Sequence, residues 1–81
     1  MPELVRLKTY IELGKVLSCD AVKLDEQGRA AEALELYEQA IDALTLAANA
    51  EDNKTVRTTI SSRIQEYSRR IEVIRRELMV L

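Results

Sequence analysis

The chain has 81 residues, enough for one domain over residues 1–81 but too few for a large core with a deep pocket. Apolar residues make up 47% and charged residues 32%, which is typical of a soluble helical protein. Two glycines and one proline supply few turns, which disfavours a β-sheet. The lack of histidine removes the commonest general base and metal ligand.

The charge is unevenly distributed along the chain. Residues 1–53 contain 5 basic and 11 acidic side chains, whereas residues 54–81 contain 7 basic and 3 acidic ones. Such an asymmetry can steer a charged partner, but acidic and basic helices packed side by side would also produce it. We favour mutual neutralisation as the reason for most of it.

The single cysteine, Cys19, cannot form an internal disulfide, which indicates a reducing compartment. The first residues lack the apolar stretch of a signal peptide. No stretch approaches the roughly 18 apolar residues of a membrane span. We therefore expect no direct membrane insertion, and any association with a membrane to come through a partner.

Pro2 suits the first turn of a helix over residues 2–26, because its missing N–H is not needed there. Gly14 within this segment costs roughly 1 kcal/mol relative to alanine unless it lets a neighbouring helix approach closely. The segment carries one apolar face at spacings of three and four: Leu7, Tyr10, Ile11, Gly14, Leu17, Ala21 and Leu24.

A first break follows at residues 26–29, where Gly28 suits the left-handed position after a helix end. The next helix is predicted over residues 30–49. Its apolar arc has two edges, one with Ala33, Tyr37, Ile41, Leu44 and Ala48, the other with Leu36, Ala40, Ala43, Ala47 and Ala50. An arc this wide is typical of a helix that contacts two neighbours.

A second break lies at residues 50–54, where Asp52 or Asn53 suits the N-cap of a third helix over residues 54–80. Its apolar residues form a heptad seam: Val56, Ile60, Ile64, Tyr67, Ile71, Ile74, Leu78 and Leu81. A two-stranded coiled coil is possible, but the short loops favour packing within the chain. We predict an all-α, antiparallel up-down-up three-helix bundle.

No pattern indicates catalysis, a cofactor or a metal site. Ser18, Ser61 and Ser62 have no histidine to activate them, and Asp20 beside Cys19 disfavours a reactive thiolate. The arginines of residues 54–80 lie on several sides of the predicted helix and are mixed with glutamates, whereas nucleic acid requires a concentrated basic face. We expect neither an enzyme nor a nucleic-acid-binding protein.

Two separate stretches contain motifs that are typical of a known family. In residues 21–41, an acidic residue and a glycine turn precede Glu-Ala-Leu-Glu-Leu-Tyr at 32–37 and the pair Ala40-Ile41. Residues 64–72 contain Glu66-Tyr67-Ser-Arg-Arg70-Ile-Glu72. The first stretch resembles the helical-hairpin pattern of the microtubule-interacting and trafficking (MIT) family, and the second is similar to that family's helix-three motif. Gly28, Ala33, Tyr37 and Ala40-Ile41 also resemble half of a tetratricopeptide repeat, but that pattern occurs only once here.

The resemblance implies a protein-interaction module. MIT domains dock short C-terminal tails of ESCRT-III subunits in interhelical grooves, and thereby recruit an attached effector to membrane-remodelling sites. It implies a cytoplasmic protein, peripheral to endosomal or division-site membranes through its partners, and a monomer as an isolated domain. The alternative is a tetratricopeptide-like or coiled-coil element for oligomerisation or scaffolding.

One departure from the family pattern affects the choice of groove. Ser68 and Arg69 stand where ESCRT-disassembling ATPases carry Leu and Asp, and Ser61, Ser68, Glu72 and Arg75 make that flank of helix three polar. The groove between helices two and three, with Ser61, Ser68 and Glu72, is therefore our alternative site. We expect the working groove between helices one and three, with walls formed by Ile11, Lys15, Ser18, Val22, Arg63 and Arg70. Arg63 and Arg70 suit an acidic or carbonyl-rich tail, or else simply neutralise the acidic first half.

Overall fold

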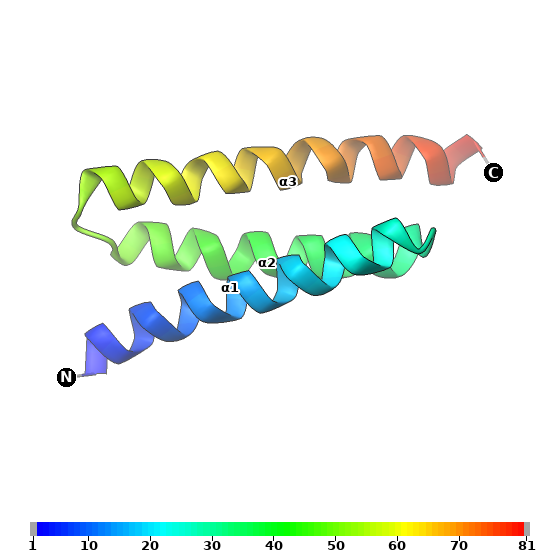
Figure 1. The fold of residues 1–81 in the computed structure, drawn as a ribbon. Helices are drawn as coiled ribbons and strands as arrows, with labels where there is room; N and C mark the ends of the chain where they lie inside the picture. Colours follow the sequence, from blue (N-terminus) through cyan, green and yellow to red (C-terminus); the bar gives the residue numbers. More distant parts are fainter. Residues whose placement is uncertain (1, 81) are drawn as a thin grey trace.

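The computed structural model describes the backbone of residues 2–80 and the side chains of residues 9–80. Within this part, the chain forms three helices: α1 (Pro2–Glu26), α2 (Ala30–Ala50) and α3 (Lys54–Val80). They run up, down and up in an elongated bundle, as predicted (Figure 1). α2 ends one residue later than expected, at Ala50.

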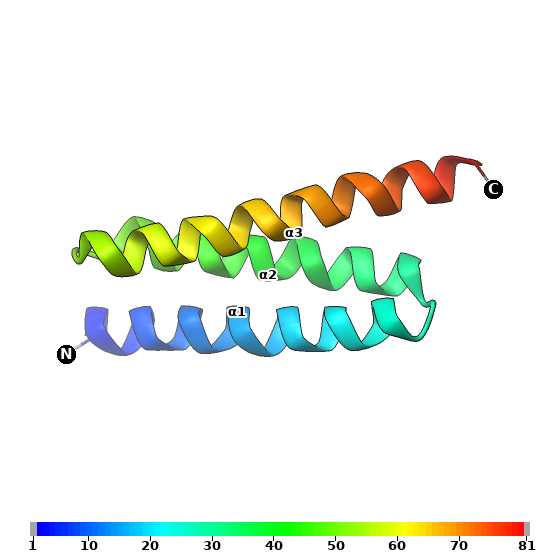
Figure 2. The same cartoon turned by 45° about the horizontal axis from the view of Figure 1, so that its top comes forward.

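α2 is the middle helix, with α1 and α3 on either side of it (Figure 2). In the described part of the chain, no Cα atom of α1 lies within 8 Å of one in α3, whereas both helices approach α2 within that distance. The wide apolar arc predicted for α2 accordingly faces two neighbours. Its buried residues are Ala33, Tyr37, Ala40, Ala43, Leu44, Ala47 and Ala48.

The two turns use the local signals that the sequence contains. Gly28 has a φ of +77°. The Gly28 N–H donates to the Asp25 carbonyl, and the Arg29 N–H donates to the Leu24 carbonyl, at 3.0 and 2.9 Å. This pair of bonds is the Schellman ending of a helix. At the second turn Asn53 is the N-cap, because its Oδ1 accepts hydrogen bonds from the N–H groups of residues 55 and 56.

Gly14 lies at a close contact between α1 and α2. A Cβ atom at this position would lie 2.6 Å from Cδ2 and 2.8 Å from Cγ of Leu44. Of the two expectations for Gly14, close approach of a neighbouring helix is therefore the correct one.

The heptad seam of α3 packs against α2 of the same chain. Ile60, Ile71 and Ile74 are buried in it, with Ile74 fully inaccessible to solvent. Val56 remains 38% exposed at the start of the seam. The side chains of Leu7 and Leu81, which the sequence analysis also assigned to apolar faces, lie outside the described residues. None of the described helices carries an apolar stretch that would cross a bilayer.

Candidate functional site

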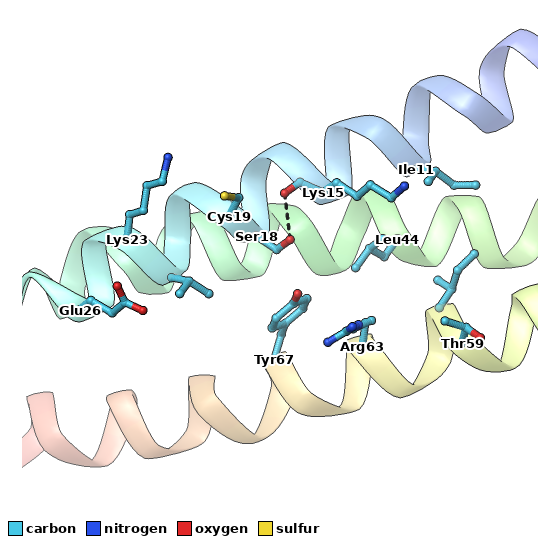
Figure 3. A pocket seen from close by; sticks show the side chains of 12 residues that line it. Ile11, Lys15, Ser18, Cys19, Lys23, Glu26, Leu44, Thr59, Arg63 and Tyr67 are labelled. Carbon is cyan, nitrogen blue, oxygen red and sulfur yellow. Dashed lines mark hydrogen bonds between the residues drawn. The ribbon is translucent and has the colours of Figure 1, made fainter.

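A groove of about 690 Å³ lies between α1 and α3, above Leu44 of α2. It exists because α1 and α3 both pack on α2, while in the described residues no Cα atom of α1 lies within 8 Å of one in α3. Figure 3 shows α1 and α3 on opposite sides, with Leu44 between them. The α1 side consists of Ile11, Lys15, Ser18, Cys19, Val22, Lys23 and Glu26, and the α3 side of Thr59, Ile60, Arg63 and Tyr67.

The base of the groove is apolar and largely fixed in place. Leu44 and Ile60 are 6% and 7% exposed because they also belong to the core. Ser18 is buried as well, and its Oγ donates to the Lys15 carbonyl at 3.1 Å. This local bond satisfies the hydroxyl within its own helix, so a small polar residue can occupy a buried position. Val22 is 37% exposed and adds an accessible apolar surface.

Positive charge predominates among the groove residues. Lys15 and Lys23 form no ion pair with any residue in the described part of the chain. The Lys23 side chain points away from α3 in Figure 3, whereas Arg63 lies on the α3 wall. Within the described part of the chain, the one ion pair of Arg63 is with Glu66, at 3.2 Å, and it is exposed, so water screens it strongly. Among the described residues, Glu26 is the one acid that lines this groove.

A charged network joins the three helices. Nε and Nη2 of Arg70 each donate to a carboxylate oxygen of Asp25 at 2.6 Å, and the Tyr37 hydroxyl donates to the same carboxylate at 3.1 Å. Asp25 belongs to α1, Tyr37 to α2 and Arg70 to α3. The bidentate geometry is the strong form of an arginine–carboxylate contact. Arg70 therefore ties α3 to the end of α1.

The network shifts the proton affinities of its members in the directions that its geometry requires. Hydrogen bonds from Arg70 lower the pKa of the Asp25 carboxyl below its ordinary value, against the effect of its own burial. Burial first, and then the bond to the Asp25 carboxylate, raise the pKa of Tyr37 to about 12. The bonds to Asp25 raise the pKa of Arg70. The network is thus charged, and Tyr37 is protonated, at neutral pH.

A smaller groove of about 410 Å³ lies between α2 and α3. Its residues are Glu38, Ile41, Asp42, Ser68, Ile71, Glu72 and Arg75. Nη2 of Arg75 donates to Oε1 of Glu38 at 2.6 Å, so an ion pair joins the two walls. Three of the four charged side chains here are acidic, which is the opposite of the α1/α3 groove.

The structure brings most of the residues proposed from the sequence together. Ile11, Lys15, Ser18, Val22 and Arg63 line the α1/α3 groove. Arg70 does not line it, because its guanidinium is engaged by Asp25. Of the residues proposed for the α2/α3 groove, Ser68 and Glu72 line it and Ser61 does not.

Several groove residues were missed by sequence reasoning: Cys19, Lys23, Glu26, Leu44, Thr59, Ile60 and Tyr67. Leu44, Ile60 and Tyr67 were recognised only as core residues, since helical periodicity cannot show that a core side chain also borders a groove. The helical spacing could have identified the missed α1 residues. Cys19, Lys23 and Glu26 follow Lys15 at steps of four, four and three, so they lie on the same helix face as the proposed α1 wall.

In the described residues no group of three or more acidic or cysteine side chains is arranged to hold a metal ion. A family model described as the MIT (microtubule interacting and transport) domain matches residues 11–76. That range includes both motifs singled out in the sequence and every residue that lines either groove. Comparison with curated proteins and with solved structures found no match. The three-helix fold, the two motifs and the match over most of the chain show that this protein belongs to the MIT domain family and is a protein-interaction module.

Proposed function

We propose that this domain docks a short C-terminal tail of an ESCRT-III-type subunit in the α1/α3 groove. Through that contact it recruits an attached effector to sites of membrane remodelling, at endosomal or division-site membranes. The tail supplies an extended segment with apolar side chains for Val22 and Ile11, and with acidic groups or carbonyls for Lys15 and Arg63.

The observation that supports this choice of groove is the contrast between the two grooves. The α1/α3 groove is the larger of the two, with an apolar base and two lysines without ion-pair partners in the described chain. The α2/α3 groove is smaller, and the Arg75–Glu38 pair bridges its walls. A segment entering the smaller groove must displace or cover that ion pair, which costs desolvation.

The expected affinity is weak. One segment in a shallow groove buries less than the roughly 1,600 Å² of a standard protein interface, and it loses chain entropy on ordering. We expect a Kd in the micromolar range, about −7 to −8 kcal/mol. Recruitment then depends on several domains engaging a polymerised partner at once.

A two-dimensional amide NMR titration tests the proposal. The probes are two synthetic ESCRT-III tail peptides, one containing proline and one helical with leucine and arginine. We expect the proline-containing peptide to shift resonances of α1 and α3 around the groove. Arg63→Glu should weaken this binding at least tenfold, because a repulsive charge replaces an attractive one next to the peptide.

Arg75→Glu is the matched control, because Arg75 lies on the same helix and its side chain is 58% exposed against 62% for Arg63. It borders the other groove and should leave binding of the proline-containing peptide unchanged. Loss of binding in Arg75→Glu but not in Arg63→Glu would move the site to the α2/α3 groove. No shifts with either peptide at millimolar concentration would refute ESCRT-III tail docking.

A further inference from the structure

The hydroxyl of Tyr67 is a hydrogen-bonding group that the fold does not use. Tyr67 lines the α1/α3 groove from α3, and its hydroxyl points across the groove toward α1 (Figure 3). It forms no hydrogen bond with any residue in the described part of the chain. The hydroxyl is also accessible to solvent. Among the described residues, every solvent-inaccessible side-chain nitrogen or oxygen of a buried or half-buried residue has a hydrogen-bond partner, and the Tyr67 hydroxyl has none, so it is not inaccessible.

The ring that carries this hydroxyl is held in place. Tyr67 packs against Tyr37, with ring centroids 5.7 Å apart and an angle of 31° between the ring planes. Tyr67 also packs against both groups of buried core residues. The Tyr37 hydroxyl, in contrast, donates its hydrogen to the Asp25 carboxylate. The Tyr37 hydroxyl thus stabilises the fold, while the Tyr67 hydroxyl faces the groove.

This placement restricts what a bound segment must offer. A ligand lying over Leu44, Ile60 and the Tyr67 ring displaces the water that hydrates the Tyr67 hydroxyl. Leaving the hydroxyl without an acceptor would weaken binding, because a desolvated polar group without a partner is unfavourable, so a well-fitting ligand supplies an acceptor at this point. An extended segment has free main-chain carbonyls along its whole length, whereas the carbonyls of a helical segment are occupied within the helix.

We propose that the Tyr67 hydroxyl donates a hydrogen bond to a main-chain carbonyl of an extended segment bound in the α1/α3 groove. This inference rests on the proposed function and adds a specificity-determining residue to it. Tyr67 makes the groove selective for extended tails over helical ones, while Arg63, one turn earlier on the same helix, attracts acidic groups. The bond adds discrimination by conformation rather than by side-chain type.

Tyr67→Phe tests the inference, because it removes only the hydroxyl and keeps the ring that packs on Tyr37. We expect the Kd of the proline-containing ESCRT-III tail peptide to increase about three- to tenfold, which corresponds to one hydrogen bond. Binding of the helical peptide should be unchanged. Tyr10→Phe is the control, since Tyr10 is half-buried against the core and does not line the groove, and it should bind both peptides like the unmodified protein.

An amide-to-ester series in the proline-containing peptide, titrated against the unmodified protein and Tyr67→Phe, identifies the acceptor. An ester carbonyl accepts hydrogen bonds poorly, so the ester at the contact site should weaken binding to the unmodified protein but not to Tyr67→Phe. Unchanged affinity in Tyr67→Phe, with Arg63→Glu still impaired, would overturn this inference and leave the proposed function standing. Failure of the unmodified protein to bind either peptide would refute both.

Discussion

Asp25 occupies a position that its own helix disfavours. It lies in the last turn of α1, where the carbonyl end of the helix dipole repels a negative charge. Its side chain is nevertheless only 14% exposed, because Arg70 and Tyr37 surround the carboxylate. The sequence motifs contained all three residues, but they did not indicate that Arg70 rather than Arg69 would pair with Asp25. That choice depends on the rotation of α3 about its axis, which packing of the heptad seam on α2 determines.

We expect Asp25→Asn to destabilise the domain by about 1–3 kcal/mol, since it leaves a partly buried guanidinium with a weaker, neutral partner. Urea denaturation of the variant and the unmodified protein at pH 7 measures the difference. Glu66→Gln is the control, because it removes an ion pair whose side chains are 62% and 59% exposed. Such a pair contributes less than about 1 kcal/mol.

The effect of Asp25→Asn should depend on pH in a defined direction. The folded-state pKa of Asp25 lies below its ordinary value of 3.8, so its contribution to stability is present above that pH. The contribution is lost as the pH falls through the folded-state pKa. The stability difference between the variant and the unmodified protein should therefore shrink in acid. A difference that stays constant from pH 7 to pH 2 would show that Asp25 does not act through its charge.

Gly14 sets the distance between two elements. Its missing side chain lets α1 approach Leu44 of α2, which in turn forms the base of the groove. The sequence left two interpretations of this glycine open, a cost in helix stability or the close approach of a neighbouring helix. It could not decide between them, because the residue that faces Gly14 depends on the register between α1 and α2. That register is long-range information which helical periodicity does not contain.

We expect Gly14→Ala to destabilise the domain by about 1–2 kcal/mol, although alanine is the better helix former by about 1 kcal/mol. The added Cβ would lie 2.8 Å from Cγ of Leu44, a buried residue, so the Leu44 side chain must move within the core. Thermal denaturation measures the loss, and displaced Leu44 methyl resonances in NMR spectra locate it. A variant more stable than the unmodified protein would show that the two helices are not in close contact there.

The helices themselves could be predicted almost completely, because their signals are local. Gly28 ends α1 and Asn53 begins α3 through bonds to residues at most five positions away. The apolar arc of α2 likewise indicated a helix between two others, since the width of the arc depends only on its own residues. These features need no knowledge of the rest of the chain, which explains why the observed boundaries agree with the expected ones to within one residue.

At the scale of the whole molecule, the groove could be predicted only in part. The α1 wall followed from one helix face, so Ile11, Lys15, Ser18 and Val22 were identified together. The α3 wall required the rotation of α3 relative to α1. Both helices pack on α2, and in the described residues no Cα atom of α1 lies within 8 Å of one in α3. The packing of α1 on α2 and the packing of α3 on α2 must both be known before Tyr67 can be recognised as a groove residue and not only a core residue.

The heptad seam of α3 packs within its own chain, which leads to a prediction about the oligomeric state. A two-stranded coiled coil would need Ile60, Ile71 and Ile74 to face a second chain, but these residues are already buried against α2. We therefore expect a monomer from about 10 μM to 1 mM, because no long apolar stripe of α3 remains available for a partner helix.

Sedimentation equilibrium measures the mass of the protein across this concentration range. Substituting Val73, which is 40% exposed on α3, with lysine is the control and should leave the mass unchanged. A mass that rises toward that of a dimer, with Val73→Lys preventing the rise, would show that α3 has a second apolar contact face and would favour the oligomerising alternative.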